Sequence, residues 1–211
     1  MKGQVKTVMR MRKKKNGDKR FEKCAEYYIT EKSQNVDGFY LEIGCGKGGF
    51  MVQLAKKYPD RNFIAMEKIS DVILLAAEKM KREELQNINM LNADAGELLE
   101  YFAEQSVSGI YLNFSDPWPR PKHAKRRLTA PSYLEIYKKL LKKGGAIYLK
   151  TDNRILFDYS LETLKEAGFR LEKLTYDLHN SEYEKDNLHT EYEDNFSAKG
   201  FPINRVEAYI D

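Results

Sequence analysis

Short apolar runs alternate with amphipathic segments along most of this chain. Five runs have the length and near-continuous hydrophobicity of buried parallel strands: 39–43, 62–66, 88–92, 109–114 and 146–150. Segments with helical periodicity lie between and after them: 49–57, 70–84, 97–103, 131–142 and 153–167. This alternation predicts an α/β fold with a mostly parallel sheet, right-handed crossovers and helices on both faces.

Local signals set the expected ends of these helices. Ser70 is a suitable N-cap, and Pro131 fits a first helical turn. We expect Gly144 and Gly145 to end the helix at 131–142, and Gly168 to close the last one.

The rhythm changes after Gly168. Two further strands are predicted at 170–175 and 205–209, joined by a long polar link over about 177–203. The return of the chain predicts a seven-stranded sheet with an antiparallel last strand. Because long connections in compact domains are usually functional, we expect the link to close over a substrate.

Composition narrows the class of protein. The chain has 211 residues, 42% hydrophobic and 32% charged, which is typical of a globular domain. We expect a flexible basic arm at 1–20 and a single domain at 21–211. No apolar stretch approaches the roughly 18–20 residues that span a bilayer, and no secretion signal is evident. Two cysteines without metal-ligand spacing favour a reducing cytoplasm and no metal site.

Positive charge is clustered rather than abundant, since the net charge is only +4. One cluster occupies the first 23 residues and the other occupies 120–127. Clustered cations attract a polyanion, most often a nucleic acid, although the N-terminal cluster alone is equally consistent with a solvated arm.

A glycine-rich turn follows the first predicted strand, with Gly44, Gly46 and Gly48 preceding a helix. With Gly49 in the count the turn also satisfies G-x-G-x-x-G, so a dinucleotide site is an alternative. Glu42 argues against it, because a carboxylate there would repel a pyrophosphate. The same carboxylate suits a cationic ligand such as the ammonium of a methionine moiety.

Acidic residues also mark the ends of the next two strands. Glu67 is placed to accept ribose hydroxyls, and Asp94 to meet an adenine amino group, at the edge where open α/β sheets bind ligands. The alternatives are surface charge for Glu67 and a helix cap for Asp94. Together with the glycine turn, the pattern resembles the Rossmann-like class I methyltransferases, which bind S-adenosylmethionine.

The segment after the fourth strand carries the most specific signal. Its sequence is Asn-Phe-Ser-Asp-Pro-Trp-Pro, in which two prolines stiffen the backbone around Asp116. Cations follow directly, so the segment suggests a carboxylate that binds a nucleic-acid base next to cations that bind phosphate.

That segment, extended through Lys-Arg-Arg-Leu-Thr at 125–129, resembles the signature of bacterial tRNA (guanine-N7-)-methyltransferases. The resemblance continues in Lys-Thr-Asp-Asn at 150–153, Asp-Leu-His at 177–179 and Thr-Glu-Tyr-Glu at 190–193. It implies a class I methyltransferase that uses S-adenosylmethionine, and tRNA as partner, with methylation at N7 of guanosine 46 in the variable loop. Pro121 departs from the pattern, since it stands where the family has a cation.

The resemblance also implies roles for individual residues. Asp116 is expected to be catalytic, and the expected cofactor-binding residues are Glu42, Gly44, Gly46, Gly48, Glu67, Asp94 and Asp116. The expected substrate contacts are Arg120, Asp152, Thr190, Glu191, Tyr192 and Glu193. The expected RNA contacts are Lys122, His123, Lys125, Arg126 and Arg127. No metal and no membrane contact are expected, and the oligomeric state, monomer or homodimer, stays open.

Three other readings remain at this point. One is a methyltransferase of another RNA, of a small molecule or of a protein, which the basic clusters disfavour. Another is an NAD-dependent oxidoreductase, which Glu42 disfavours. The last is a non-catalytic RNA-binding module, which the acids at successive strand ends disfavour.

Overall fold

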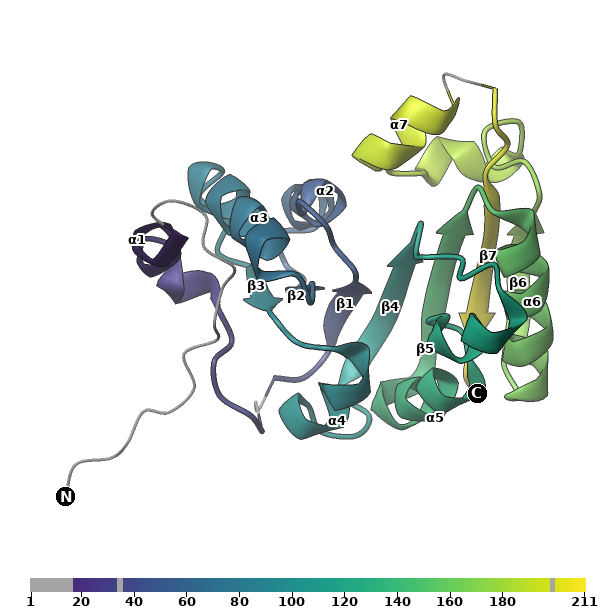
Figure 1. Cartoon of the computed structure of the whole chain (residues 1–211), viewed down its shortest axis with the longest axis horizontal. Helices are drawn as coiled ribbons and strands as arrows, with labels where there is room; N and C mark the ends of the chain where they lie inside the picture. The colour runs from purple at the N-terminus through teal and green to yellow at the C-terminus, as the bar shows by residue number, and fades with distance from the viewer. Residues whose placement is uncertain (1–16, 34–35, 198–199) are drawn as a thin grey trace.

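The computed structural model describes residues 17–33, 36–197 and 200–211. Its centre is one seven-stranded sheet in the order β3-β2-β1-β4-β5-β7-β6 (Figure 1). The strands are β1 Phe39–Ile43, β2 Phe63–Met66, β3 Ile88–Leu91, β4 Val107–Asn113, β5 Leu141–Thr151, β6 Arg170–Thr175 and β7 Asn204–Tyr209. Strand β7 lies between β5 and β6 and is antiparallel to both, while the β1–β5 neighbours pair in parallel. The predicted fold class is confirmed.

Helices cover both faces of the sheet and create two apolar cores. Helices α2 (Gly49–Lys57) and α3 (Ser70–Arg82) bury one core, centred on residues such as Met51 and Met80. Helices α4 (Leu98–Tyr101), α5 (Pro131–Leu140) and α6 (Arg154–Glu166) bury the other. The apolar stripes of α2, α3, α5 and α6 explain why these helices form there, since each has buried positions three to four residues apart.

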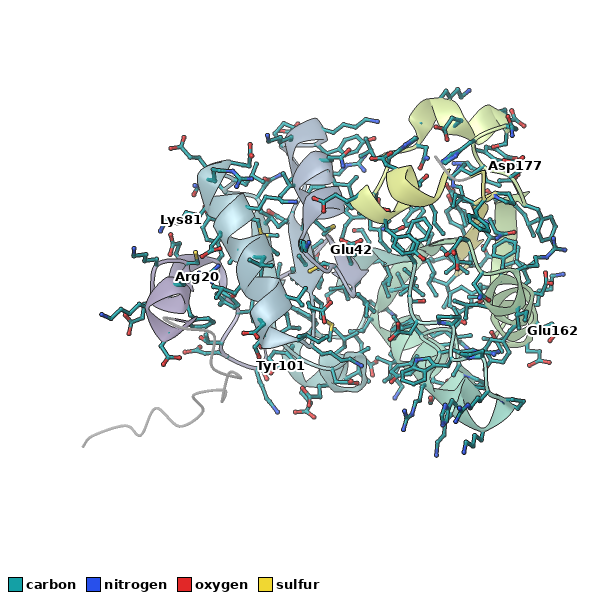
Figure 2. All side chains as sticks on the ribbon, turned by 45° about the horizontal axis from the view of Figure 1, so that its top comes forward. Arg20, Glu42, Lys81, Tyr101, Glu162 and Asp177 are labelled. Carbon is teal, nitrogen blue, oxygen red and sulfur yellow. The ribbon has the colours of Figure 1, made fainter. Side chains whose placement is uncertain are left out.

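The start of the described chain packs beside α3. Helix α1 (Gly17–Glu22) is tied to it by the guanidinium of Arg20, which makes two hydrogen bonds of 2.6 Å to Glu78. Lys81 of α3 forms a second ion pair with the start of the described chain, at 2.7 Å from Glu26. Figure 2 labels Arg20 and Lys81, which lie near each other. Residues 17–20 of the predicted arm are therefore helical, whereas residues 1–16, with the N-terminal cations up to Lys15, lie outside the described residues.

Two predicted helix ends are wrong. The N-cap of α3 is Ile69, because Ser70 instead donates its hydroxyl to Oδ1 of Asn92 at 2.9 Å. Helix α5 ends at Leu140, before the glycine pair. Leu141 has an extended backbone and is the first residue of β5. Its side chain is only 2% exposed, because it packs in the apolar core.

The long link between β6 and β7 has structure of its own. It contains a 3₁₀ helix η4 (Glu182–Asp186) and helix α7 (Glu191–Ser197). Figure 1 shows α7 at the end of the molecule towards which β4 and β5 point. Within the described ranges, every helix is too short or too polar to cross a bilayer.

Candidate active site

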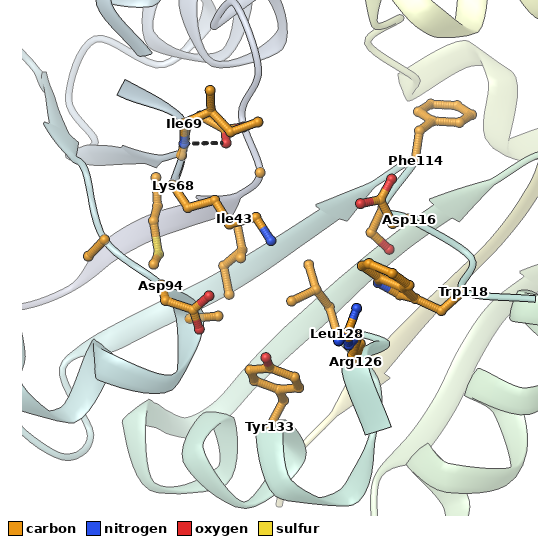
Figure 3. Close-up of a pocket in the computed structure, with 16 residues that line it drawn as sticks. Ile43, Lys68, Ile69, Asp94, Phe114, Asp116, Trp118, Arg126, Leu128 and Tyr133 are labelled. Carbon is orange, nitrogen blue, oxygen red and sulfur yellow. Dashed lines mark hydrogen bonds between the residues drawn. The ribbon is translucent and has the colours of Figure 1, made fainter. Parts of the chain in front are cut away.

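A cavity of about 490 Å³ opens at the carboxyl ends of the parallel strands (Figure 3). Three of the predicted acids line it: Glu67 after β2, Asp94 after β3 and Asp116 after β4. Tyr133 of α5 and Trp118 complete the walls around them. The fold thus brings together residues that are up to 49 positions apart in the sequence, because parallel strands all end at one edge.

Glu42 directly precedes Ile43 and Gly44 of the cavity wall but is not itself a lining residue. Its side chain is 2% exposed, near the middle of the molecule (Figure 2). Oε1 accepts a hydrogen bond from Nδ2 of Asn113 at 2.9 Å, whereas Oε2 is a buried atom without a partner among the described residues. Burial raises the pKa of Glu42 to about 7, although Asn113 and Lys150 act against that rise. A buried carboxylate oxygen without a donor is the feature that a cationic ligand would satisfy.

The three glycines of the predicted turn have different roles. Gly44 (φ +81°) and Gly46 (φ +55°) adopt the left-handed region, and a side chain there would point into open space. Gly44 lines the cavity, so its backbone is open to a ligand. Gly48 instead allows α2 to pack on α3, since a Cβ there would lie 2.8 Å from Cβ of Ala76.

Glu67 and Asp94 each bind a local backbone N–H and also line the cavity, so a structural role and a ligand-binding role are both compatible with their positions. One oxygen of Glu67 accepts from the backbone N–H of Ile69 at 2.9 Å, and one oxygen of Asp94 accepts from that of Gly96 at 3.0 Å. Asp94 is therefore the cap of a short 3₁₀ helix, yet both carboxylates also face the cavity. The backbone bonds fix their orientation, which prepares the second oxygen of each for a ligand.

The loop that carries Asp116 is held in an unusual backbone conformation. Phe114 (φ +50°) and Trp118 (φ +42°) are both left-handed, which costs energy for large side chains. The carbonyl of Lys150 anchors the N–H of Phe114 at 2.8 Å. Arg127 donates to the carbonyls of Pro117 and Trp118 at 3.0 and 3.3 Å. Asp116 itself is exposed at the cavity, so the loop presents its carboxylate outward.

The basic segment divides into one buried and several accessible cations. Arg127 is 6% exposed and stacks on Tyr159, so it shapes the loop rather than facing solvent. Arg126 lies 4.8 Å from the Trp118 ring and also lines the cavity. His123 meets the edge of the same ring, so Trp118 packs between neighbours. The remaining predicted cations are exposed: Arg120, Lys122 and Lys125.

The predicted substrate segment at 190–193 has buried side chains at its two ends and exposed side chains at the two positions between them. Thr190 and Glu193 are 8% and 0% exposed. Tyr192 is 41% exposed; its ring lies 4.8 Å from that of Phe114 and its hydroxyl 3.5 Å from Oδ2 of Asp152. Tyr192 and Asp152 therefore lie together beside the Asp116 loop. Glu191 points the other way and pairs with Lys79 of α3 at 2.5 Å.

Sequence reasoning missed several residues that shape this site. Asn113, Tyr133 and Lys150 were not singled out for a role, although Asn113 stands in the recognised Asn-Phe-Ser-Asp segment and Lys150 in the recognised Lys-Thr-Asp-Asn segment. Their contacts cross from one strand or helix to another, so spacing along the chain gives no signal for them.

Two histidines also come together without any signal in the sequence. The rings of His179 and His189 stack at 5.1 Å, and with Glu193 they form a group that has metal-ligand geometry. Both nitrogens of His189 already meet carboxylates, Asp194 at 2.8 Å and Glu184 at 2.6 Å. Because a metal would have to break these bonds, we assign none.

Two solved structures that share this fold are methyltransferases. A 16S rRNA methyltransferase, KamB, matches with a TM-score of 0.63 at 16% identity, over 98% of this chain and 97% of its own. An antibiotic-related methyltransferase matches with a TM-score of 0.61 at 17% identity, over 97% and 96%. The fold is therefore that of the class I methyltransferases, with an acidic cavity at the carboxyl ends of its parallel strands.

Sequence comparison narrows this class. Residues 37–206 match a family described as putative methyltransferases. The tRNA (guanine-N(7)-)-methyltransferase of Pediococcus pentosaceus is 47% identical over 85% of this chain and 84% of its own. The enzymes of the same name from Listeria innocua and Brevibacillus brevis are 49% and 45% identical, each over 84% of this chain and 82% and 83% of their own. The chain belongs to the tRNA (guanine-N(7)-)-methyltransferase family.

The cavity fits the cofactor of this class, S-adenosylmethionine. Glu67 and Asp94 offer carboxylate oxygens to the hydroxyl and amino donors of a nucleoside, and the unpartnered Oε2 of Glu42 suits an ammonium group. A pyrophosphate would face the same acids unfavourably, which counts against the dinucleotide alternative.

Proposed function

We propose that this protein transfers the methyl group of S-adenosylmethionine to N7 of a guanosine in tRNA, at position 46 of the variable loop. One observation carries the proposal: Asp116 shares a single cavity with Glu67 and Asp94 and has Trp118 and Arg126 beside it. In this proposal Glu67 and Asp94 bind the nucleoside of the cofactor and Asp116 binds the base, and the 47% identity to a tRNA (guanine-N(7)-)-methyltransferase supports it.

Methyl transfer to guanine N7 requires no general base from the protein. Guanine N7 has a lone pair in the neutral base, and the sulfonium cofactor supplies an electrophilic methyl group. What the chain must provide is alignment, which is worth up to about 7–11 kcal/mol in well-oriented reactions. The left-handed Phe114 and Trp118 and the bonds from Arg127 serve this need, because they fix the loop on which Asp116 stands.

The second requirement is electrostatic. Methylation at N7 leaves the purine with a positive charge, and a nearby carboxylate stabilises that charge. In our proposal the carboxylate of Asp116 accepts hydrogen bonds from N1–H and the N2 amino group of the guanine. Asp152 and Tyr192, which lie together beside this loop, are proposed to hold the other side of the base.

Exposed cations next to the cavity are proposed to hold the RNA. Arg120, Lys122 and Lys125 face solvent, and Arg126 stands at the cavity wall. Cations in this position bind phosphate without reading sequence, while the base enters the cavity from an open loop of the RNA. The basic arm at 1–20 is proposed to add further phosphate contacts to the domain at 21–211.

A tRNA substrate and two free, buried cysteines, Cys24 and Cys45, support a cytoplasmic location.

The proposal is tested by incubating the full-length protein with labelled S-adenosylmethionine and bulk tRNA. Digestion to nucleosides is expected to yield labelled 7-methylguanosine. A tRNA transcript with guanosine at position 46 is the substrate for a second measurement, and the same transcript with adenosine there is the matched control. Label in both transcripts would overturn the position, and label in neither would overturn the activity.

A further inference from the structure

The buried ammonium of Lys150 links the end of strand β5 to the segment that precedes and begins α7. Its Nζ donates to Oε2 of Glu193 at 2.6 Å, to the carbonyl of Leu188 at 2.9 Å and to Oδ1 of Asn187 at 3.1 Å. The Lys150 side chain is 8% exposed and that of Glu193 is 0% exposed. All three N–H groups of the ammonium therefore have acceptors, away from solvent.

The second carboxylate oxygen of Glu193, Oε1, also has two hydrogen-bond donors. Oε1 accepts from Nδ2 of Asn187 at 2.7 Å and from Nε2 of His179 at 3.0 Å. Burial by itself would raise the pKa of Glu193, but Lys150, Asn187 and His179 together hold it below its ordinary value. A charged carboxylate with this many donors is a fixed structural element.

The same carboxylate caps helix α7. The backbone N–H of Glu193 donates to Oγ1 of Thr190 at 2.9 Å, and the backbone N–H of Thr190 lies 3.3 Å from Oε2 of Glu193. This reciprocal pair is a capping box, which the spacing Thr-x-x-Glu produces at a helix start. Thr190 and Glu193 thus hold the start of helix α7 through these two bonds.

Lys150 also reaches the catalytic loop through its backbone. Its carbonyl accepts from the N–H of Phe114 at 2.8 Å, two residues before Asp116. On the far side, α7 places Tyr192 against the Phe114 ring at 4.8 Å. Lys150 therefore holds both rings of the Phe114–Tyr192 contact. Its carbonyl binds the N–H of Phe114, and its ammonium binds Glu193 next to Tyr192. This contact lies beside Asp116 and Asp152.

From this arrangement, and resting on the proposed function, we infer that Lys150 is a positioning residue for methyl transfer: by holding Glu193 and the Leu188 carbonyl, it fixes α7 so that Tyr192 stands against Phe114 and Asp152. Each oxygen of Glu193 already has two donors, Lys150 and the Thr190 N–H on Oε2 and Asn187 and His179 on Oε1, so the orientation of this carboxylate is fixed by the protein.

Two substitutions separate these roles. Lys150→Met removes the ammonium and leaves the buried charge of Glu193 unpaired, whereas Lys150→Met combined with Glu193→Gln removes both charges. Gln also serves at the third position of a capping box, so the helix start survives in the double variant. Lys142→Met is the matched control, because Lys142 forms an ion pair with Asp37 at the other end of the same strand.

The expected result is a loss of kcat/KM for tRNA of about tenfold or more in Lys150→Met, with most of it regained in the double variant. The dissociation constant of S-adenosylhomocysteine is expected to stay within about twofold, which separates positioning from a general loss of structure. The control is expected to match the wild type. A wild-type kcat/KM in Lys150→Met overturns the inference, as does a double variant that is as slow as Lys150→Met.

Amide hydrogen exchange tests the same inference without activity. Backbone amides of residues 190–194 are expected to exchange faster in Lys150→Met than in the wild type, whereas those of β1 keep their rates. Equal exchange at 190–194 overturns the inference. Thr190→Val, which breaks only the capping box, supplies the measurement if Lys150→Met does not fold, and it is expected to speed the same amides. A wild-type protein that methylates no tRNA overturns the proposed function, while the exchange measurement still decides the role of Lys150.

Discussion

Asn113 donates its side-chain amide to Oε1 of Glu42 at 2.9 Å, from strand β4 to the neighbouring strand β1. This bond holds a buried carboxylate under the glycine turn and leaves Oε2 free for a ligand. The pair lies at the switch point of the sheet, where β1 has β2 on one side and β4 on the other.

Ligand affinity is expected to depend on the ionisation of Glu42. Its pKa is raised to about 7 by burial, so the carboxylate is mostly protonated at pH 6 and mostly ionised at pH 8. Titration calorimetry with S-adenosylhomocysteine is expected to show affinity rising about tenfold over this range. In Glu42→Gln binding is expected to be weak and nearly independent of pH. Parallel pH profiles for the two proteins would contradict the assignment.

The ligand-free protein is expected to show the opposite trend in stability. Because the folded-state pKa of Glu42 lies above its ordinary value of 4.5, the group favours folding below that value and loses this contribution as pH rises through about 7. The free energy of unfolding should therefore fall with pH relative to Glu42→Gln, by an order of about 3 kcal/mol between pH 4 and pH 8. Denaturant unfolding at several pH values measures this difference, and an identical pH dependence in both proteins would refute it.

Removal of the Asp116 carboxylate is expected to stop methyl transfer without removing the cofactor. Asp116→Ala should reduce kcat by about a hundredfold or more, since it withdraws charge stabilisation from the methylated purine. The affinity for S-adenosylhomocysteine should stay within about tenfold, or 1.4 kcal/mol. Asp158→Ala, on the exposed surface of α6, is the control and should leave both quantities unchanged. Wild-type turnover in Asp116→Ala would remove this residue from the mechanism.

Exposed cations beside the cavity are expected to set the salt dependence of tRNA binding. Changing Lys122, Lys125 and Arg126 to Ala should weaken binding and reduce the slope of log K against log salt by about 0.7–0.9 for each phosphate that the variant no longer neutralises. The control changes Lys139, Lys143 and Lys165, exposed lysines at the opposite end of the sheet, and should leave the slope unaltered. An unchanged slope in the first variant would place the RNA elsewhere.

Arg127 is expected to behave differently from its basic neighbours. It is buried and supports the carbonyls of Pro117 and Trp118, so Arg127→Ala should destabilise the loop and lower the melting temperature. A cost of about 1–3 kcal/mol is the order expected for buried acceptors left without a donor. Thermal unfolding of Arg127→Ala beside Lys125→Ala measures it, and equal melting temperatures would show that Arg127 has no such role.

Gly48 is expected to tolerate no side chain. Its φ of +72° and the 2.8 Å approach to Cβ of Ala76 both oppose a methyl group, so Gly48→Ala should cost about 1–3 kcal/mol of folding stability. Gly96→Ala is the control, since an added Cβ there meets only Asp94 at an ordinary 3.5 Å. Chemical denaturation of the two variants gives the comparison, and equal stabilities would mean that α2 and α3 can separate without cost.

Strand positions followed closely from the sequence, because a buried parallel strand is a short apolar run whatever its partners are. The predicted range 39–43 coincides with the buried parallel strand β1, and the range 49–57 coincides with α2. The range 170–175 also coincides with β6, although β6 is a mostly exposed edge strand that pairs antiparallel with β7. The end of α5 did not follow, since Leu141 satisfies a helical pattern as well as a strand. Its burial beside Val107 decided for the strand.

The acids at the strand ends were also found from the sequence, because the topology of a parallel sheet sends every such residue to one edge. The order of residues in the chain could not reveal that Glu42 is buried and outside the cavity wall, whereas Glu67, Asp94 and Asp116 line the cavity. Nor could it separate buried Arg127 from exposed Lys125, two residues apart in one basic run.

The sequence by itself determined the class of fold, the edge that carries the site and the family, since all three depend on local patterns and on residues close together in the chain. Only the tertiary structure decided how the Thr-Glu-Tyr-Glu segment is held in place. Its buried Glu193 meets Lys150, which is 43 positions away, and no local pattern reports a contact over that distance. Whether a charged side chain is buried and which partner it meets depend on how the whole chain packs. The same short sequence can therefore contact a ligand, cap a helix or form a buried ion pair, depending on its surroundings.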